Sequence, residues 1–539
     1  MKVFLHVNQT LFFPDEKTRI KNLNKLICVY KNILHPLWKI FPIFEFKNRR
    51  NMKAGKDIFN VILFCCALIM IPSCAVNPVT GRKQLMLMSE AQEIALGKQY
   101  DPQVIATFGE YPDHKLLNFI SDKGTQMGKI SHRPNLQYHF RILDSPVINA
   151  FAVPGGYIYL TRGILAQFNN EAELMGVLGH EMGHITARHT VSQQSKQQLG
   201  QLLLIGGMIA SEKFRDFAGY AMSGMQLLFL KFSRDNEREA DRLGVEYSSR
   251  INYDASKMAD FFNVLNKMHL EANQGGIPTF MSTHPDPGDR YNSVNNLAGV
   301  WKDSLNNTSW MVNEEDYLKL IDGMVYGDDP RQGYVKSGVF YHPDMKFKFP
   351  VPGGWKFENS PLQVQMAPDD NRAVIIFTLA KQSDAEQASQ TILHDLNLTI
   401  LDSKRGKVNG MPSIATVSQQ VTQNQQTGSQ QVLKVMSYFI EYNGSVYVFH
   451  GVASDADFNS FFRTFESTMT NFNRLADPSK LNVRPQRINV VEVRRNSKLA
   501  DAFRSLNVPD ADRNKLALLN NMELSDRVRA GKLLKIISY

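Results

Sequence analysis

Residues 179–184 read Gly-His-Glu-Met-Gly-His, and the apolar residues 172–179 predict a helix that runs into this motif. Four residues of an α-helix correspond to about 400° of rotation and roughly 6 Å of rise, so His180 and His184 should face the same way. Neutral imidazole is a good ligand for Zn²⁺, which needs three protein ligands and one open position when it is catalytic. Glu181 would stand beside the ion and could take a proton from water as general base. The spacing therefore predicts the metal centre of a metallopeptidase, although an isolated motif of this length also arises by chance.

A second expected helix offers a third ligand. Residues 233–244 contain the pattern Glu-x-x-Ala-Asp, which begins at Glu237 and ends at Asp241. These two side chains are four residues apart and share one helix face. Glu237 could complete a set of two histidines and one glutamate, and Asp241 could accept a hydrogen bond from a ligand imidazole and fix its tautomer. Glu239 points to another side of the helix and is expected in solvent.

A third histidine ligand is not expected after the first motif. The longer three-histidine motif has Gly and His where this chain has Ala187 and Thr190. His189 lies off the face that carries His180 and His184, and we expect it to be structural or exposed.

Four motifs follow one another along this part of the chain. They are residues 149–158 (Asn-Ala-Phe-Ala-Val-Pro-Gly-Gly-Tyr-Ile), the two motifs above, and residues 282–285 (Ser-Thr-His-Pro) followed by Arg290. In this order they resemble the HtpX-like and BepA-like zinc peptidases, with the CAAX prenyl proteases as more distant relatives, over roughly residues 76–330. The resemblance implies a mostly helical gluzincin fold with a small sheet beside the active-site helix. It also implies cleavage of misfolded or stalled envelope proteins.

The same resemblance suggests roles for further residues. It implies that the strand near Asn149 and Ala150 is an exposed edge beside the metal, to which an extended substrate can add by backbone hydrogen bonds. The alternative is that Asn149 closes a turn. For His284 it favours stabilisation of the oxyanion or a reversible fourth bond to zinc, and a structural histidine is the third possibility. Arg290 would be a neighbouring contact for the oxyanion or for a substrate carboxylate.

Two apolar runs follow the metal-binding helix. They cover residues 202–210 and 217–230, and neither reaches the length of a membrane span. By analogy with the resembled family, we expect a lid or plug packed over the cleft. An ordinary pair of buried helices is the alternative.

The N-terminal segment has the pattern of a targeting signal. Two lysines follow Met52, and an apolar run over residues 58–71 leads to Ile-Pro-Ser-Cys at residues 71–74. This pattern is typical of a lipoprotein signal peptide over residues 52–73. We therefore expect translation to start at Met52 and residues 1–51 to be a mis-assigned start or an extension. The alternative is a genuine N-terminal extension with an uncleaved anchor.

Cys74 is the expected site of lipidation. Several acyl chains together give stable anchoring to a membrane. Ala75 at the next position resembles lipoproteins sent to the outer membrane, so we expect a periplasmic, lipid-anchored protein, at the outer membrane. The cysteines, Cys28, Cys65, Cys66 and Cys74, all lie at or before this site, so the mature protein would contain no disulfide.

The positive charge of the chain is concentrated at its N-terminus. Residues 1–51 carry a net charge of +7 and residues 52–73 carry +1, which leaves only +1 of the formal +9 for the remainder. The basic balance is therefore no sign of nucleic-acid binding, and no nucleic-acid partner is expected.

The length of 539 residues predicts two or three domains. In the first, we expect a capped helix from Ser89, a helix near residues 114–130, a strand at 137–143 and a strand pair around 154–156. After a linker near residues 322–330, we expect strands at 347–355, 373–380 and 438–449, helices at 384–396 and 457–471, and a loop at 419–431. The strands at 438–449 should form a hairpin around Asn443-Gly444.

The fold class predicted from these elements is multidomain. A mostly α-helical zincin peptidase domain with a small β-sheet would span residues 74–325. An α+β domain would follow at residues 335–476, with a weak resemblance to the PsbP-type sandwich. Residues 483–539 resemble a degenerate LysM module, which would suggest contact with peptidoglycan, and a small β-α-α-β cap is the alternative.

The predicted function is that of a zinc endopeptidase with one Zn²⁺ per chain, acting on unfolded or misassembled envelope proteins. An envelope chaperone or outer-membrane assembly factor, in which client binding dominates over cleavage, is the alternative. A structural lipoprotein with an inactive zinc site is a third possibility. The presence of Glu181 argues against the third, because a structural site has no use for a base beside an open coordination position.

Overall fold

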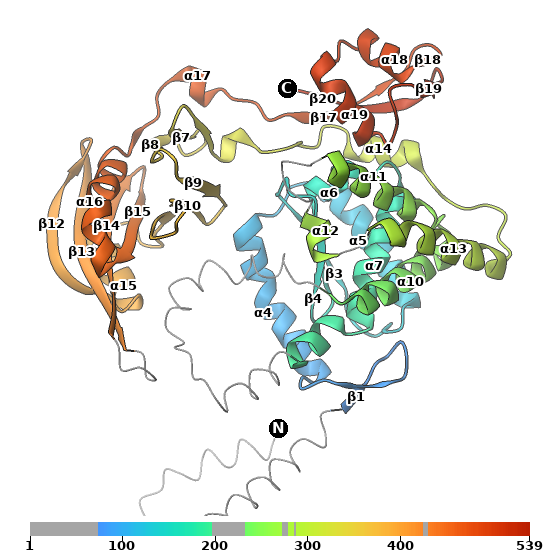
Figure 1. The fold of residues 1–539 in the computed structure, drawn as a ribbon, viewed down its shortest axis with the longest axis horizontal. Coiled ribbons are helices and arrows are strands. Elements are labelled where there is room, and N and C mark those ends of the chain that lie inside the picture. Colours follow the sequence, from blue (N-terminus) through green and yellow to red (C-terminus); the bar gives the residue numbers. More distant parts are fainter. Residues whose placement is uncertain (1–73, 197–231, 272–278, 285–286, 424–429) are drawn as a thin grey trace, which may run out of the picture. The chain divides into compact units, whose positions relative to one another are not determined.

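The structure, a computed structural model, describes residues 74–196, 232–271, 279–284, 287–423 and 430–539 (Figure 1). These residues belong to one compact unit. The predicted signal peptide, the extension before it and the apolar runs of the predicted lid lie outside the described residues. Within the described ranges, no helix has the length and apolar character needed to cross a membrane.

Helices dominate the N-terminal domain, residues 74–325. Its elements are β1 (Cys74–Val76), β2 (Lys83–Leu85), α4 (Glu90–Phe108), α5 (His114–Ile130), β3 (His139–Leu143), β4 (Ala150–Val153), β5 (Tyr157–Thr161), α6 (Arg162–Gln167), α7 (Glu171–Thr186), α10 (Arg234–Arg250), α11 (Lys257–Glu271), α12 (Thr279–Thr283), α13 (Pro287–Leu305) and α14 (Glu314–Ile321). The prediction of a capped helix is confirmed, since Ser89 and Gln92 form a reciprocal capping box at the start of α4. The predicted helix near residues 114–130 is α5.

A small sheet lies beside α7 and supports it. Its strand order is β3-β5-β4, with β3 parallel and β4 antiparallel to β5. The turn between β4 and β5 needs glycine, because Gly155 and Gly156 have φ values of 85° and 98°. The strands predicted around this turn are confirmed. Every residue of α7 is buried, so this helix lies at the centre of the domain (Figure 1).

The central domain, residues 335–476, contains two antiparallel sheets. One has the strand order β12-β13-β14-β15-β11-β10-β9 and the other β16-β8-β7-β6. The bounds are β6 (Tyr334–Lys336), β7 (Val339–His342), β8 (Phe347–Pro350), β9 (Lys356–Asn359), β10 (Gln363–Ala367), β11 (Ala373–Leu379), β12 (Thr399–Val408), β13 (Met411–Gln423), β14 (Gln430–Tyr442), β15 (Ser445–Ser454) and β16 (Asn473–Arg474), with helices α15 (Ala385–Asp395) and α16 (Asp455–Thr470).

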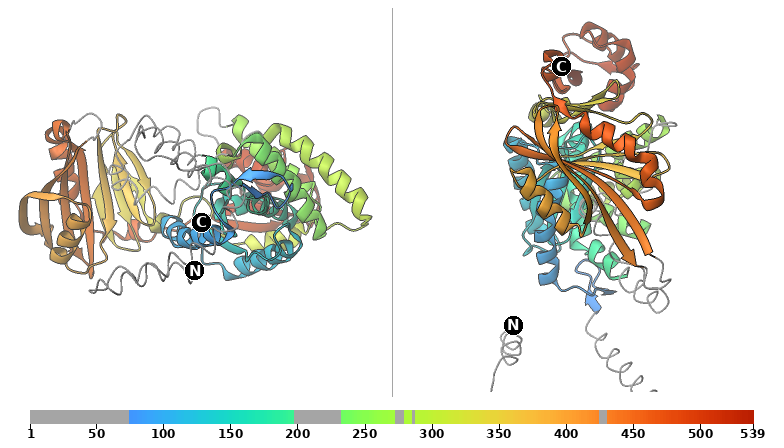
Figure 2. Two further views of the ribbon diagram at one scale, coloured as in Figure 1. Left: turned by 90° about the horizontal axis from the view of Figure 1, so that it is seen from below. Right: turned by 90° about the vertical axis from the view of Figure 1, so that its left-hand side faces the viewer.

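Side-chain alternation along β14 divides the core of this domain into two. Met436 and Ile440 pack with the aromatic residues of α16, whereas Val435 and Phe439 pack with α15. Successive strand residues point to opposite faces, so the two helices cover opposite sides of the larger sheet (Figure 2). The predicted hairpin is confirmed: Asn443 and Gly444, with φ values of 49° and 75°, connect β14 to β15.

The prediction of a loop at residues 419–431 is wrong at both ends of that range. Residues 419–423 continue β13, and β14 begins at Gln430, with Thr422 paired to Gln431. Polar side chains do not prevent a strand from continuing when its backbone is paired on a ladder and the side chains face water. Residues 424–429 lie outside the described part of the chain.

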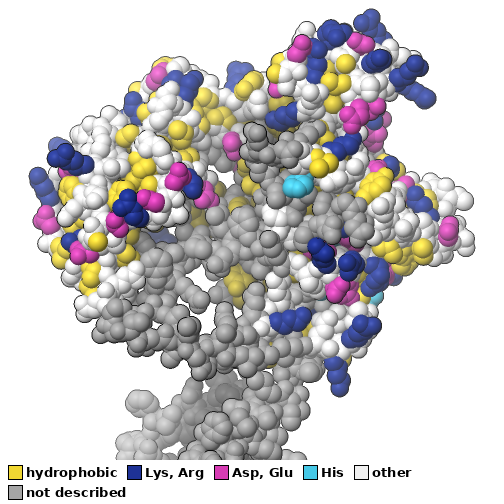
Figure 3. Space-filling view, in the orientation of Figure 1, with side chains coloured by type: hydrophobic (Ala, Val, Ile, Leu, Met, Phe, Trp, Pro, Cys, Tyr) yellow, Lys and Arg dark blue, Asp and Glu magenta, His cyan; other side chains and the backbone are white. Residues whose placement is uncertain are grey.

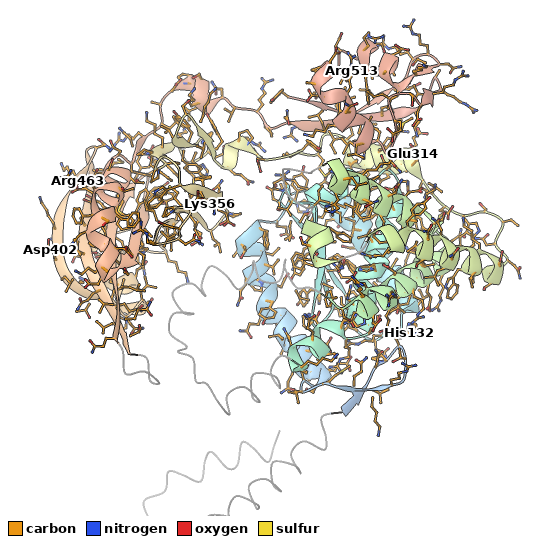
Figure 4. The ribbon with its side chains drawn as sticks, in the orientation of Figure 1. His132, Glu314, Lys356, Asp402, Arg463 and Arg513 are labelled. Carbon is orange, nitrogen blue, oxygen red and sulfur yellow. The ribbon has the colours of Figure 1, made fainter. Side chains whose placement is uncertain are left out.

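The C-terminal module, residues 483–539, has its own small core and contacts the N-terminal domain. It consists of β17 (Arg487–Glu492), β18 (Ser497–Lys498), α18 (Leu499–Ser505), α19 (Arg513–Leu519), β19 (Arg527–Val528) and β20 (Leu533–Ser538). Ile488 of β17 belongs to the core of the N-terminal domain. Glu314 of α14, which is labelled in Figure 4, forms an ion pair with Lys532. The LysM resemblance stays a prediction.

A fully buried lysine strengthens this contact. Lys535 Nζ donates hydrogen bonds to the carbonyl oxygens of Ala166, Gln167 and Phe168, at 2.9, 3.2 and 2.9 Å. Burial lowers the pKa of Lys535. These carbonyls end α6 shortly before α7 begins, so the last strand of the chain helps to fix the start of the central helix.

Basic side chains gather on the C-terminal module (Figure 3). Residues 483–539 carry twelve Lys and Arg against six Asp and Glu, whereas residues 74–539 as a whole have a net charge of only +1. The exposed basic residues Arg494, Arg495, Lys498, Arg527 and Arg529 lie on or next to the short pair β18 and β19. This module therefore carries an excess of basic side chains, several of which are exposed.

A buried histidine makes the stability of the central domain sensitive to acid. His450 on β15 is 5% exposed, and burial lowers its pKa to about 4 from the usual 6.5. The folded state binds a proton on His450 less readily than the unfolded state does. The free energy of unfolding is therefore highest above pH 6.5 and decreases by roughly 3 kcal/mol as the pH falls toward 4.

The exchange His450→Asn tests this effect. Denaturant unfolding at pH 7 and pH 4.5 should show a smaller change in the free energy of unfolding for His450→Asn than for the wild type. His394→Asn, at an exposed histidine, should match the wild type, and an unchanged pH effect in His450→Asn would contradict the prediction.

Candidate metal centre

Four side chains from three parts of the N-terminal domain converge at one point. His180 and His184 come from α7, Glu237 from α10 and His284 from the end of α12, and one ligand atom of each lies within 4.8 Å of the others. His180 Nε2 lies 3.1 Å from His184 Nε2, and both are 3.6 Å from oxygens of Glu237. All four residues are buried. The structure thus brings together the three predicted ligands and His284.

Glycines allow α7 and α10 to approach closely enough for this geometry. A Cβ atom added to Gly179 would lie 3.0 Å from the carbonyl oxygen of Gly244, and one added to Gly244 would lie 3.0 Å from the backbone nitrogen of His180. Such distances are shorter than normal carbon contacts, so larger side chains would push the helices apart. The backbone contact fixes Glu237 at its distance from the two histidines.

Asp241 holds the outer nitrogen of the first histidine. His180 Nδ1 lies 2.9 Å from Asp241 Oδ1, and Arg290 donates two hydrogen bonds to the same carboxylate, at 2.8 and 2.6 Å. Burial opposes ionisation of Asp241, but Arg290 and the hydrogen bond from His180 lower its pKa to about 2. An ionised Asp241 makes Nδ1 of His180 the protonated nitrogen, which leaves the Nε2 lone pair directed at the centre.

The outer nitrogen of the second histidine has a different partner. His184 Nδ1 lies 3.0 Å from Nδ1 of His189, whose Nε2 lies 3.0 Å from Glu239 Oε2. His189 is 2% exposed, as the structural alternative for it predicted. The prediction that Glu239 is solvated is wrong: its side chain is 19% exposed and bonds to His189. Sequence spacing on α10 does not reveal this contact, because His189 reaches it from another segment.

The surroundings keep His184 neutral, and aromatic rings pack on His184 and His284. Burial, together with the neighbouring imidazoles, lowers the pKa of His184 well below its usual value. Phe232 stacks on His184 and Phe280 on His284, with ring centroids 4.0 and 4.5 Å apart. Neutral, oriented imidazole is the form that binds a metal ion.

This donor set fits Zn²⁺. The Nε2 atoms of two imidazoles and one carboxylate converge at one point, an arrangement that a cation would stabilise. Two histidines and one glutamate form a known type of catalytic zinc site, which keeps one position open. Burial opposes ionisation of Glu237, but His284 and Arg290 lower its pKa, so the carboxylate is available as a ligand.

Glu181 has the position expected of a general base. It is 1% exposed, neither carboxylate oxygen has a hydrogen-bond partner among the described residues, and Oε1 lies 3.6 Å from His284 Nε2. Burial raises the pKa of Glu181. A buried carboxylate that accepts no hydrogen bond costs stability, so its place beside the candidate ligands calls for a functional reason.

The remaining predicted site residues lie around this centre. His284 Nδ1 is 3.1 Å from both oxygens of Glu237, within the ligand group. Arg290 is 5% exposed and is engaged mainly by Asp241, while its Nη1 lies 3.4 Å from Glu237. The catalytic roles predicted for His284 and Arg290 stay predictions.

The strand beside the metal helix is at the edge of its sheet. β4 pairs only with β5 within the described sheet, and Asn149 and Ala150 lie at its start. Both are buried rather than exposed, and the backbone N–H of Phe280 donates a hydrogen bond to Ile148 O at 3.0 Å. The chain at α12 therefore already covers part of this edge, and substrate contact there stays a prediction.

Comparison with known proteins decides the family of this domain. Residues 118–298 match peptidase family M48, a range that includes the whole metal centre. The chain therefore contains an M48 zinc-metallopeptidase domain. The match agrees with the resemblance inferred from the four sequence motifs.

Relatives of the M48 domain include named peptidases. A beta-barrel assembly-enhancing protease of Yersinia pestis is 30% identical over 271 residues, which cover 48% of this chain and 54% of that protein. The mitochondrial metalloendopeptidase OMA1 of Arabidopsis thaliana is 29% identical over 180 residues, 32% of this chain and 34% of that protein. The human mitochondrial metalloendopeptidase OMA1 is 22% identical over 289 residues, 51% and 52% of the two chains. The chain thus spans about half the length, or less, of these relatives.

A solved structure matches about a quarter of the chain. The solution structure of cyanobacterial PsbP from Synechocystis is 10% identical, and the match covers 26% of this chain and 91% of that one with a TM-score of 0.20. A score this low carries no argument about the fold, so the PsbP-type sandwich stays a prediction.

Zinc binding by the M48 domain should depend on the glycine contact between its helices. In Gly244→Ala, the new Cβ would meet Gly176 O and His180 N at 3.0 Å, so Glu237 should move away from the histidines and zinc affinity should fall. Competition with a chelator measures that affinity. Gly299→Ala on α13 is the matched control, since its Cβ has no atom within 4 Å and the exchange should leave zinc affinity unchanged. Equal zinc affinity in both variants would contradict the role of the contact.

Proposed function

We propose that the chain is a zinc endopeptidase that hydrolyses peptide bonds of misfolded or stalled envelope proteins. The observation that carries this proposal is the buried carboxylate of Glu181, which has no hydrogen-bond partner among the described residues and lies beside the converging residues His180, His184 and Glu237. A structural metal site would have no use for such a group. The M48 match supports the same activity.

In this proposal, three residues hold one Zn²⁺ and the others handle the substrate. His180, His184 and Glu237 are the ligands, and Asp241 orients His180. Zinc bound there would supply Lewis acidity that polarises the scissile carbonyl and acidifies water. Because the site is buried, the charges of these residues act in a medium of low dielectric, where they are more effective than in bulk water.

Glu181 transfers the proton. It takes a proton from the attacking water and delivers it to the leaving amine. Burial raises the pKa of its carboxyl group, which makes the carboxylate a stronger base than one in solvent. The absence of a competing hydrogen bond on either oxygen, within the described chain, leaves the group free to accept this proton.

His284 is proposed to act at the same centre. Its Nδ1 lies among the ligand atoms, 3.2 Å from His180 Nε2 and 3.1 Å from Glu237, which favours the role of a reversible fourth ligand among the three predicted roles. Release of this side chain would open a position for substrate. Arg290, through its Nη1, is the proposed neighbouring contact for the oxyanion or a substrate carboxylate.

An extended polypeptide is the proposed form of the substrate. β4 is the edge strand of its described sheet and lies next to α7, and Asn149 and Ala150 lie at its start. Backbone pairing at such an edge is tolerant of side-chain identity, as quality control of many proteins requires.

The cellular setting is proposed from the N-terminal sequence and the named relatives. A lipid on Cys74 would anchor the protein in the periplasm, at the outer membrane, where misassembled envelope proteins accumulate. One relative is named a beta-barrel assembly-enhancing protease, which fits this location. The basic C-terminal module is the proposed contact with peptidoglycan, which carries carboxylate groups.

The exchange Glu181→Gln tests the mechanism. The variant should keep one zinc per chain, because Glu181 is no ligand, and should lose casein cleavage by about 10²- to 10⁴-fold, because no base remains. Metal analysis and a casein assay measure both. Glu315→Gln, on α14 with a side chain 68% exposed, is the control and should cleave like the wild type. Full activity in Glu181→Gln would sink the mechanism, and loss of its zinc would refute the assignment of Glu181 as a group outside the ligand set.

A further inference from the structure

The two ligand imidazoles of α7 are supported in different ways. Nδ1 of His180 faces a carboxylate directly, at 2.9 Å from Asp241. Nδ1 of His184 faces another imidazole, that of His189, at 3.0 Å. An imidazole whose own protonation is undetermined cannot orient a ligand, so the partner of His189 decides what the contact does.

Glu239 decides the tautomer of His189. Its Oε2 lies 3.0 Å from His189 Nε2, and a carboxylate can only accept, so the proton of His189 belongs on Nε2. Nδ1 of His189 is then an acceptor for the N–H of His184. His184 in turn keeps its proton on Nδ1, and its Nε2 lone pair points into the ligand group, 3.1 Å from His180 Nε2.

A left-handed turn brings His189 to this position. Arg188, two residues after the end of α7, has φ of 57°, which is strained for a residue other than glycine. Its Nε donates to Glu93 Oε2 at 2.9 Å, and its Nη2 donates to Met88 O at 3.0 Å. Glu93 is 1% exposed, so a buried charge from α4 holds the turn. His189 directly follows this turn, and its ring contacts that of His184.

Packing shields the contacts among His184, His189 and Glu239 from water. His189 is 2% exposed, and Phe232 covers both rings, with centroids 4.0 Å from His184 and 6.2 Å from His189. The second oxygen of Glu239 is buried without a hydrogen-bond partner among the described residues. A buried oxygen without a hydrogen bond lowers stability, and a role for the Glu239 oxygen that contacts His189 would explain why this loss is tolerated.

We propose that His189 and Glu239 are positioning residues that hold the zinc ligand His184 in its metal-binding tautomer and orientation. The inference rests on the proposed zinc site and extends it. Glu237, Glu239 and Asp241 of α10 would then each serve the metal, the first as ligand and the other two behind one histidine each. Removal of such outer partners typically weakens metal binding by about 10- to 100-fold.

Zinc affinity of the purified full chain, measured by chelator competition, tests this. His189→Leu should lower the affinity about 10- to 100-fold, because the acceptor for His184 is lost. His189→Asn should recover part of the loss, since its Oδ1 stands near the place of the imidazole Nδ1 and can accept the same proton. Glu239→Gln should fall between wild type and His189→Leu. Asp235→Asn, on the same helix with a side chain 90% exposed, is the control and should bind like the wild type.

Two further measurements distinguish a positioning role of His189 from an effect on the stability of the fold. The visible spectrum of the Co²⁺-substituted protein should change in His189→Leu and move back toward wild type in His189→Asn, while thermal unfolding of the metal-free form should be similar in both. Wild-type affinity and spectrum in His189→Leu would overturn the inference and leave the proposed function intact. Equal losses in the Leu and Asn variants, together with a lower melting temperature, would overturn it in favour of a purely structural role. Failure of the wild type to bind zinc would overturn the proposed function itself.

Discussion

The metal centre depends on the backbone contact between α7 and α10 at Gly179 and Gly244. Only residues without a Cβ allow the helices this close, at 3.0 Å from an added Cβ to the opposite backbone. At that separation, the alternating acidic residues of α10 reach the histidines of the α7 segment. The small sheet, the buried Lys535 of the last strand and the capped α4 all serve to hold α7 in place. Much of the N-terminal domain can thus be understood as support for one helix contact.

Local sequence signals predicted a large part of this structure. The histidine spacing in α7 and the four-residue spacing of Glu237 and Asp241 each place two side chains on one helix face. These spacings therefore predicted the group that the structure brings together and the contact between Asp241 and His180. The capping box at Ser89 and the Asn443-Gly444 hairpin depend equally on a few neighbouring residues. The geometry of such motifs depends only on residues within one turn or one helix, so it can be predicted from the local sequence.

Features that depend on distant residues were not predictable. Glu239 was expected in solvent because it lies off the face of Glu237 and Asp241, and its partner His189 reaches it only through the left-handed turn at Arg188. Glu93, which holds that turn, is 95 residues away in sequence. The backbone contact between Phe280 and Ile148, next to Asn149, likewise joins segments far apart along the chain. Residues 419–423 were assigned to a loop from composition, whereas pairing with β14 makes them a strand.

The most direct test of the metal centre is the position of zinc itself. Anomalous diffraction at the zinc edge, from crystals of the chain loaded with one equivalent of Zn²⁺, locates the ion without reference to activity. We predict one peak about 2.0–2.2 Å from Nε2 of His180, Nε2 of His184 and a carboxylate oxygen of Glu237, with Glu181 outside bonding distance. A peak elsewhere, or one coordinated by Glu181 in place of Glu237, would contradict the assignment of ligands and base.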